Sequence, residues 1–268
     1  MKEKEALPNA ANRRNFLKGA GMTGLGLAGA AMIGTTIASS SRKAEAATAV
    51  SDLDILNFAL NLEYLEAEFY SVSTYGATLE KRGILTASEV SGPTTGGQLV
   101  KGFGDWATMA TALREDEMEH VLYLRKALGS RAAKKPAINL NALGYGFGSL
   151  ASWLKLARQF EDVGVSAYLG AAPLITSKTY LGAAGAILAT EAQHSGAVRR
   201  ACYSMGIASP AVDSKDVPPS ASHPFDIDSN GLSIPRTTSQ VLNIVYAGGR
   251  CSGGFYPNGM NGTIVCQG

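Results

Sequence analysis

Four long segments of the chain repeat apolar positions at alternating three- and four-residue steps, the spacing of a helix that buries one face. They cover about residues 51–73, 98–128, 149–175 and 177–205. Ser51, with Asp54 three residues later, predicts a helix start, and Gly129 and Gly206 predict helix ends. A loop at 74–97 and a longer crossover at 129–148 separate the segments. The pattern indicates an all-α, antiparallel four-helix bundle with one long crossover.

Both ends of the chain depart from this helical pattern. The tail contains four prolines between 210 and 224, a short segment with helical character near 239–246, and a Gly-rich run at 253–262. We therefore expect three parts: an export segment at 1–46, the bundle at 47–206, and a C-terminal extension at 207–268 that packs on the bundle.

The first 46 residues are typical of a twin-arginine export signal. Arg13 and Arg14 precede a weakly apolar, Gly-rich run that ends near Ile37, and Ala44-Glu45-Ala46 offers a cleavage site. We expect the twin-arginine export machinery to be a partner, removal of the signal near Ala46, and a periplasmic or extracellular protein. A retained membrane anchor is the alternative.

The charge balance changes once this segment is set aside. Residues 1–46 hold seven of the 24 Lys and Arg residues and three of the 22 Asp and Glu residues, which leaves 17 basic and 19 acidic side chains. The basic character belongs to the signal, and nucleic-acid binding is not expected. An oxidising compartment permits a disulfide, and Cys251 and Cys266, which flank the Gly-rich run of the tail, are the candidate pair. Cys202 would then be left over inside a helix, but the sequence does not fix the pairing.

The buried apolar face of each of the four segments forms a seam along the helix, and each seam is interrupted by a carboxylate near its centre. In the second and fourth segments a histidine follows three residues later, so that both present a Glu-x-x-His pair in one direction. The chain has only three histidines, and two of them fall in this motif. The six residues are Glu63, Glu117, His120, Glu161, Glu191 and His194.

Four carboxylates at one level of an apolar core would repel one another unless cations or protons neutralised them. Two divalent metal ions would balance four negative charges, and two imidazoles would complete the coordination. Carboxylate and imidazole ligands accept both iron and manganese, so the metal stays open between Fe and Mn.

Other residues near these seams have competing interpretations. Glu66, one turn from Glu63, is an additional or rival ligand, whereas a solvated helix face is the alternative for Glu63 itself. Tyr70 and Tyr168 follow Glu63 and Glu161 by seven residues each, so the two halves of the chain repeat one plan. These tyrosines are core aromatics or hydrogen-bond donors to a ligand. The remaining acidic residues of the run 115–119, Glu115, Asp116 and Glu119, are expected to be solvated.

The chain resembles a ferritin-like family of exported bacterial proteins and plant desiccation-related proteins. The stretches that carry the resemblance are LNFALNLEYLEAEFY (56–70), EDEMEHVLYLRKALG (115–129), FEDVGVSAYLGAAP (160–173), TEAQHSGAVRR (190–200) and GGFYPNGMNG (253–262). The resemblance implies a ferritin-like bundle that holds two metal ions on the six residues named above.

Two functions of different class follow from these expectations. The first is a di-iron or di-manganese oxidoreductase that acts on hydrogen peroxide or dioxygen, in the manner of a manganese catalase or a ferroxidase, during oxidative or desiccation stress. The second is a non-enzymatic protein in which metal is sequestered or stabilises the bundle. The sequence does not decide between them, nor does it give the electron donor or the presence of a homo-oligomer.

Overall fold

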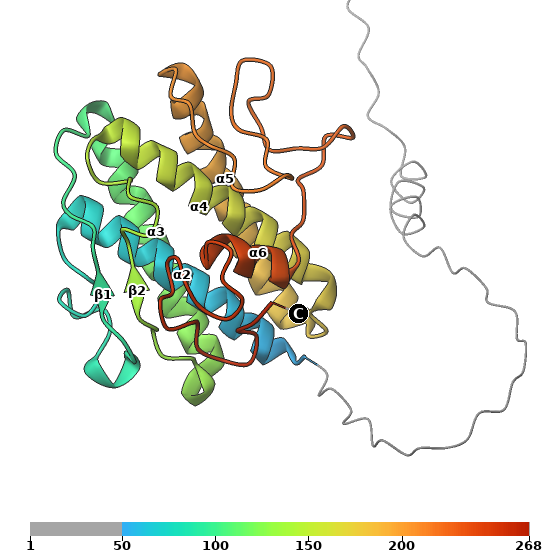
Figure 1. Cartoon of the computed structure of the whole chain (residues 1–268). Coiled ribbons are helices and arrows are strands. Elements are labelled where there is room, and N and C mark those ends of the chain that lie inside the picture. The colour runs from blue at the N-terminus through green and yellow to red at the C-terminus, as the bar shows by residue number, and fades with distance from the viewer. Residues whose placement is uncertain (1–49, 268) are drawn as a thin grey trace, which may run out of the picture. The chain divides into compact units, whose positions relative to one another are not determined.

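The computed structural model describes residues 50–267, and the predicted export segment lies outside them. Four long helices form the body of this part of the chain, which confirms the all-α bundle (Figure 1). They are α2 (Asp52–Tyr75), α3 (Ala107–Leu128), α4 (Leu150–Ala171) and α5 (Lys178–Ser204). Within the described residues, no helix has both the length and the apolar character needed to cross a bilayer.

Helix α2 is the central helix, because it is buried on almost every side. It begins with the predicted cap, in which the Asp54 amide donates to Ser51 Oγ and the Ser51 amide donates to the Asp54 carboxylate. It ends at Gly76, whose φ of 83° lies in the left-handed region that glycine tolerates best. A helix that is apolar nearly all round must be covered by neighbours, so the glutamates on α2 are buried with it.

Helix α3 starts later than the periodicity predicts, at Ala107 and not near Gln98. Gly102 and Gly104 have φ values of 80° and 53°, which a right-handed helix cannot contain. Only a short 3₁₀ turn, Gly104–Trp106, precedes the helix. The early apolar positions therefore belong to a loop that packs on the bundle.

The helices pair as α2 with α3 and α4 with α5, with the crossover between the pairs. Two short strands, β1 (Thr94–Thr95) and β2 (Ile138–Asn139), pair in parallel and join the first loop to the crossover. Ser149 and Ser177 cap α4 and α5 by accepting from backbone amides in the first turn. The remaining 3₁₀ turns are Ala87–Glu89, Gly129–Arg131 and Ala172–Leu174.

Between α2 and α4 the core is aromatic. Phe69 on α2 lies edge-on to Phe160 and stacks on Trp153, both of which belong to α4. Trp153 also donates its indole N–H to Ser73 Oγ, 2.8 Å away. This contact fixes the height of α4 against α2, so the glutamates on the two helices face one another at a common level.

The C-terminal tail is fastened to the same central helix. The Tyr256 hydroxyl donates to the Asn61 carbonyl oxygen at 2.6 Å, and Asn61 exchanges two hydrogen bonds with the backbone of Asn261. A disulfide joins Cys251 to Cys266 around this segment. Helix α6 (Thr238–Val245), close to the predicted short helix, packs on α4.

Buried ion pairs join an earlier part of the tail to α4 and α5. Asp162 on α4 accepts from Arg199 on α5, at 2.6 Å, and lies 3.4 Å from Arg158. Arg158 also pairs with Asp216 of the tail at 2.6 Å. All four side chains are buried, so each charge depends on its partner to offset the loss of water.

Loss of the disulfide should destabilise the fold through the tail. Replacing Cys251 and Cys266 with Ser should lower the free energy of unfolding by about 3 kcal/mol, the size expected for a loop of roughly 15 residues. Urea unfolding followed by circular dichroism measures this change. A reductant should lower the stability of the wild-type chain similarly and leave the double variant unchanged; an equal response of both proteins would contradict the prediction.

Candidate metal centre

The six side chains predicted from the sequence converge at the middle of the bundle. None is more than 9% exposed. Their ligand atoms form two overlapping groups in which every pair lies within 4.8 Å. The His120 group contains Glu63, Glu117, His120 and Glu191, and the His194 group contains Glu117, Glu161, Glu191 and His194. Glu117 and Glu191 belong to both groups, the arrangement expected of carboxylates shared by two ions.

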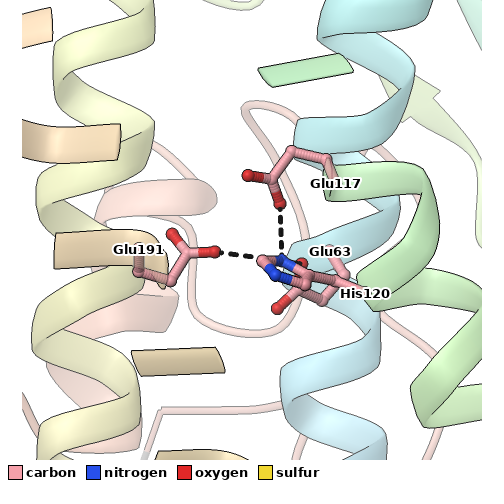
Figure 2. Close-up of side chains that lie close together, drawn as sticks. All are labelled: Glu63, Glu117, His120 and Glu191. Atoms are coloured by element: carbon pink, nitrogen blue, oxygen red, sulfur yellow. Dashed lines mark hydrogen bonds and ion pairs between the residues drawn. The ribbon is translucent and has the colours of Figure 1, made fainter. Parts of the chain in front are cut away.

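The His120 group combines side chains from three helices (Figure 2). Nδ1 of His120 lies 3.2 Å from Glu63 Oε2, 3.1 Å from Glu117 Oε2 and 3.3 Å from Glu191 Oε1. The Glu117 and Glu191 carboxylates approach the imidazole from opposite helix pairs. A cation in this space would meet one nitrogen and three carboxylates at once.

The His194 group repeats this plan on the other half of the bundle. Nδ1 of His194 lies 2.8 Å from Glu117 Oε1 and 3.4 Å from Glu161 Oε2. The two imidazole rings are 6.1 Å apart between centroids. Each Glu-x-x-His helix therefore supplies one shared carboxylate and one histidine to the centre.

Several buried atoms of these side chains lack a hydrogen-bond partner among the described residues. They are Glu117 Oε1, Glu161 Oε2, both carboxylate oxygens of Glu191, and Nδ1 of His194. A buried oxygen or nitrogen without a partner costs about 1–3 kcal/mol, and such atoms are rare in folded proteins. Their clustering on the shared side of both groups fits cation ligands, so the residues present suit a pair of divalent metal ions.

The buried charges of this centre favour proton uptake when no cation is bound. Burial raises the pKa of Glu117 to about 7, partly offset by the two imidazoles that lie beside its carboxylate. Burial and the charge of Glu117 hold the pKa of Glu191 well above its ordinary value. Although burial disfavours the imidazolium, the adjacent carboxylates of Glu117 and Glu161 raise the pKa of His194 to about 12. Divalent ions would replace these protons.

The two tyrosines donate hydrogen bonds across the halves of the bundle. Tyr168 on α4 donates to Glu63 Oε1 on α2 at 2.5 Å, and Tyr70 on α2 donates to Glu161 on α4. Burial and the adjacent carboxylates hold both hydroxyl pKa values well above 10, so the tyrosines remain proton donors. Each tyrosine therefore orients a glutamate that belongs to only one group: Tyr168 orients Glu63 of the His120 group, and Tyr70 orients Glu161 of the His194 group.

Glu66 is the fifth buried carboxylate of the centre, although it is in neither ligand group. Burial raises the pKa of Glu66 well above its ordinary value, and the charges of Glu191 and Glu117 raise it further. Gly164 provides the space between them, because a Cβ there would lie 2.5 Å from Glu191 Oε2 and 3.3 Å from Glu66 Oε1.

Asp116 makes a contact with His194 that the sequence does not predict. It was expected to be solvated, and its side chain is indeed 51% exposed, but its Oδ2 lies 3.1 Å from Nε2 of His194. The sequence did not predict this contact, because periodicity identifies which face of α3 a residue occupies and not which residue of another helix lies opposite to it.

A third acidic group, formed by Asp162, Asp216 and Asp226, does not resemble the centre. Arg158 and Arg199 already pair with Asp162, and Arg158 pairs with Asp216. The two arginines therefore neutralise these carboxylates, as a bound cation would.

A family model described as "Ferritin-like domain" matches residues 51–204. The match covers more than half of the 268 residues and includes all four long helices. No curated protein matches the chain.

Gly164 gives a direct test of the site geometry. In Gly164→Ala the new methyl group must displace the Glu191 carboxylate, which is a movable side-chain end, so the fold should survive while metal affinity falls about tenfold or more. Equilibrium dialysis measures the affinity. Gly185→Ala, on α5 with open space around the new Cβ, is the matched control and should bind metal normally. Equal affinities in the two variants would contradict this geometry.

The metal-free protein should lose stability as the pH rises. Glu117, with a pKa of about 7 when folded, retains a proton that the unfolded chain releases near pH 4.5, so folding stability decreases between these values. Glu66, Glu191 and both histidines act in the same direction at higher pH, whereas Glu63 has a lowered pKa and opposes them.

Calorimetry should therefore show a lower melting temperature for the metal-free protein at pH 8 than at pH 5.5. Added metal should raise the melting temperature more at pH 8, where fewer protons compete. Glu117→Gln removes one titrating group and should reduce the slope. A melting temperature of the metal-free protein that rises over this range would refute the proton assignment.

Proposed function

Because the chain belongs to the ferritin-like domain family, we propose that it is a di-metal protein that uses iron or manganese to act on hydrogen peroxide or dioxygen. The observation that carries this proposal is the sharing of Glu117 and Glu191 between two four-residue groups, each with its own histidine. A structural zinc site would need only one closed tetrahedral set. Two overlapping sets instead favour a pair of adjacent ions.

A pair of redox-active divalent ions would supply the two-electron chemistry that peroxide or dioxygen requires. The protein's own groups would control charge and protons around it. Tyr168 and Tyr70 hold protons on their hydroxyl oxygens against Glu63 and Glu161, and thereby fix those carboxylates in one orientation. Glu66 supplies a further carboxylate beside the shared pair, positioned to hold a proton or to complete a coordination sphere.

Burial of the centre also supports redox chemistry over simple surface binding. The glutamate ligands are at most 1% exposed, so bulk water has little access to them. Burial of this kind strengthens electrostatic interactions between ligands and ions and limits side reactions. Peroxide dismutation suits such a site outside the cytoplasm, because peroxide serves as both oxidant and reductant and no separate electron donor is needed.

We also propose that the protein reaches its compartment through the twin-arginine route, which transports folded proteins. This proposal rests on Arg13-Arg14, the apolar run and Ala44-Glu45-Ala46. A centre built from four helices must assemble during folding, which fits export after metal uptake. A mature N-terminus near Ala47 in the exported protein would support it, and an intact N-terminus would not.

The alternative function is a non-enzymatic one in which metal stabilises the bundle during stress. The specific observation in its favour is the set of unpartnered buried atoms, since any suitable cation would relieve their desolvation.

Elemental analysis of protein purified from its native compartment tests the proposal. We expect about two iron or manganese ions per chain, and oxygen release from peroxide or oxidation of added ferrous ions by the same sample. His194→Ala should lose one ion and most of the activity, whereas Glu119→Gln, on the exposed face of α3, should retain both. Two bound ions with no activity toward either oxidant would favour the structural alternative.

A further inference from the structure

The two histidines of the centre differ in what holds their outer nitrogen. Nε2 of His194 lies 3.1 Å from Asp116 Oδ2. No hydrogen bond to Nε2 of His120 occurs among residues 50–267. The groups are otherwise matched: each has one tyrosine-bound glutamate and one histidine, and both share Glu117 and Glu191.

We propose that Asp116 is a positioning residue that makes the two metal positions unequal, so that the His194 position binds its ion more tightly and fills first. This inference rests on the di-metal function proposed above and concerns the relative affinities of the two metal positions.

The first reason is the tautomer of the imidazole. A carboxylate only accepts hydrogen bonds, so Nε2 of neutral His194 must carry the hydrogen that Asp116 accepts. Nδ1 then bears the lone pair, and Nδ1 is the atom that faces Glu117 and Glu161. Asp116 therefore selects the form of His194 that can bind a cation. For His120 no described group selects between the two neutral forms, so metal binding must select the form itself.

The second reason is ring orientation and basicity. A carboxylate behind a ligating histidine fixes the ring plane and increases electron density on the ligating nitrogen. Asp116 also connects α3 to α5, since it precedes the shared ligand Glu117 on α3 and contacts His194 on α5. It therefore fixes the distance between two ligands of the same group.

Glu66 does not reverse this difference. The charges that act on it most strongly are those of Glu191 and Glu117, which both positions share. The hydrogen bond to Asp116 remains the feature that separates the histidines.

The size of the effect should be modest. Loss of such a partner typically weakens metal affinity 10- to 100-fold. Because the Asp116 side chain is 51% exposed, water screens its charge, and we expect about tenfold, the low end of that range.

Titration of the metal-free protein with Co²⁺ tests the inference, because cobalt absorption in the visible reports the number and type of ligands as well as occupancy. The wild-type chain should show two steps of unequal affinity. Asp116→Ala should weaken the tighter step about tenfold and leave the weaker step unchanged. Asp116→Glu, which keeps the carboxylate, should restore most of the difference.

Matched variants assign the steps. His194→Ala should remove the tighter step and His120→Ala the weaker one, with distinct changes in the cobalt spectrum. Glu119→Gln removes a neighbouring exposed charge from α3 and should leave both steps unchanged. Helix stability is preserved in Asp116→Ala, because alanine is the best helix former.

Two steps of equal affinity in the wild-type chain, or an equal loss in both steps of Asp116→Ala, would overturn this inference while leaving the di-metal function intact. A chain that binds fewer than two ions would overturn the proposed function and this inference with it.

Discussion

Repulsion between buried carboxylates is the constraint on which the rest of the structure depends. Five glutamates with almost no exposure lie within one level of an apolar bundle, where their charges interact far more strongly than in water. The protein offsets this cost with two histidines and two tyrosine hydroxyls, and still leaves oxygens without partners. A pair of divalent ions would complete that compensation. Without such ions, burial and mutual repulsion raise the pKa values of Glu66, Glu117 and Glu191, so bound protons neutralise part of the charge.

The surrounding fold maintains the level at which these charges meet. Trp153 fixes α4 against α2 through its hydrogen bond to Ser73, and the tail is fastened to α2 through Tyr256 and Asn261. Gly164 leaves room for the shared carboxylate where any larger residue would displace it. The crossed tyrosine bonds make each helix pair depend on the other, because Tyr70 serves Glu161 and Tyr168 serves Glu63. The apolar core supplies most of the folding free energy, while these polar contacts specify one register among the many that the apolar seams would allow.

Much of this arrangement can be predicted from the sequence, because helical periodicity and charge burial are local properties of the chain. The carboxylates at Glu63 and Glu161 interrupt long apolar seams, and the paired Glu-x-x-His motifs repeat the same frame. The start of α3 could not be predicted from periodicity alone, since apolar residues near 100–106 pack on the bundle without being part of the α-helix. Glycine conformation decided that boundary. The contact of Asp116 was also hidden, because a pattern along one helix does not report which residue on another helix lies opposite.

The two halves of the chain repeat one plan, but the hydrogen bonds to their histidines differ. An internal repeat that places one glutamate, one tyrosine and one Glu-x-x-His pair in each half would produce two equivalent ion positions. A single side chain outside the repeat would break that equivalence, because Nε2 of His194 contacts Asp116, whereas Nε2 of His120 has no hydrogen-bond partner among residues 50–267. Asp116 is half exposed, so its carboxylate stays partly solvated while it contacts the buried His194. Unequal positions would let one ion stay bound as a fixed part of the fold while its neighbour exchanges or changes coordination.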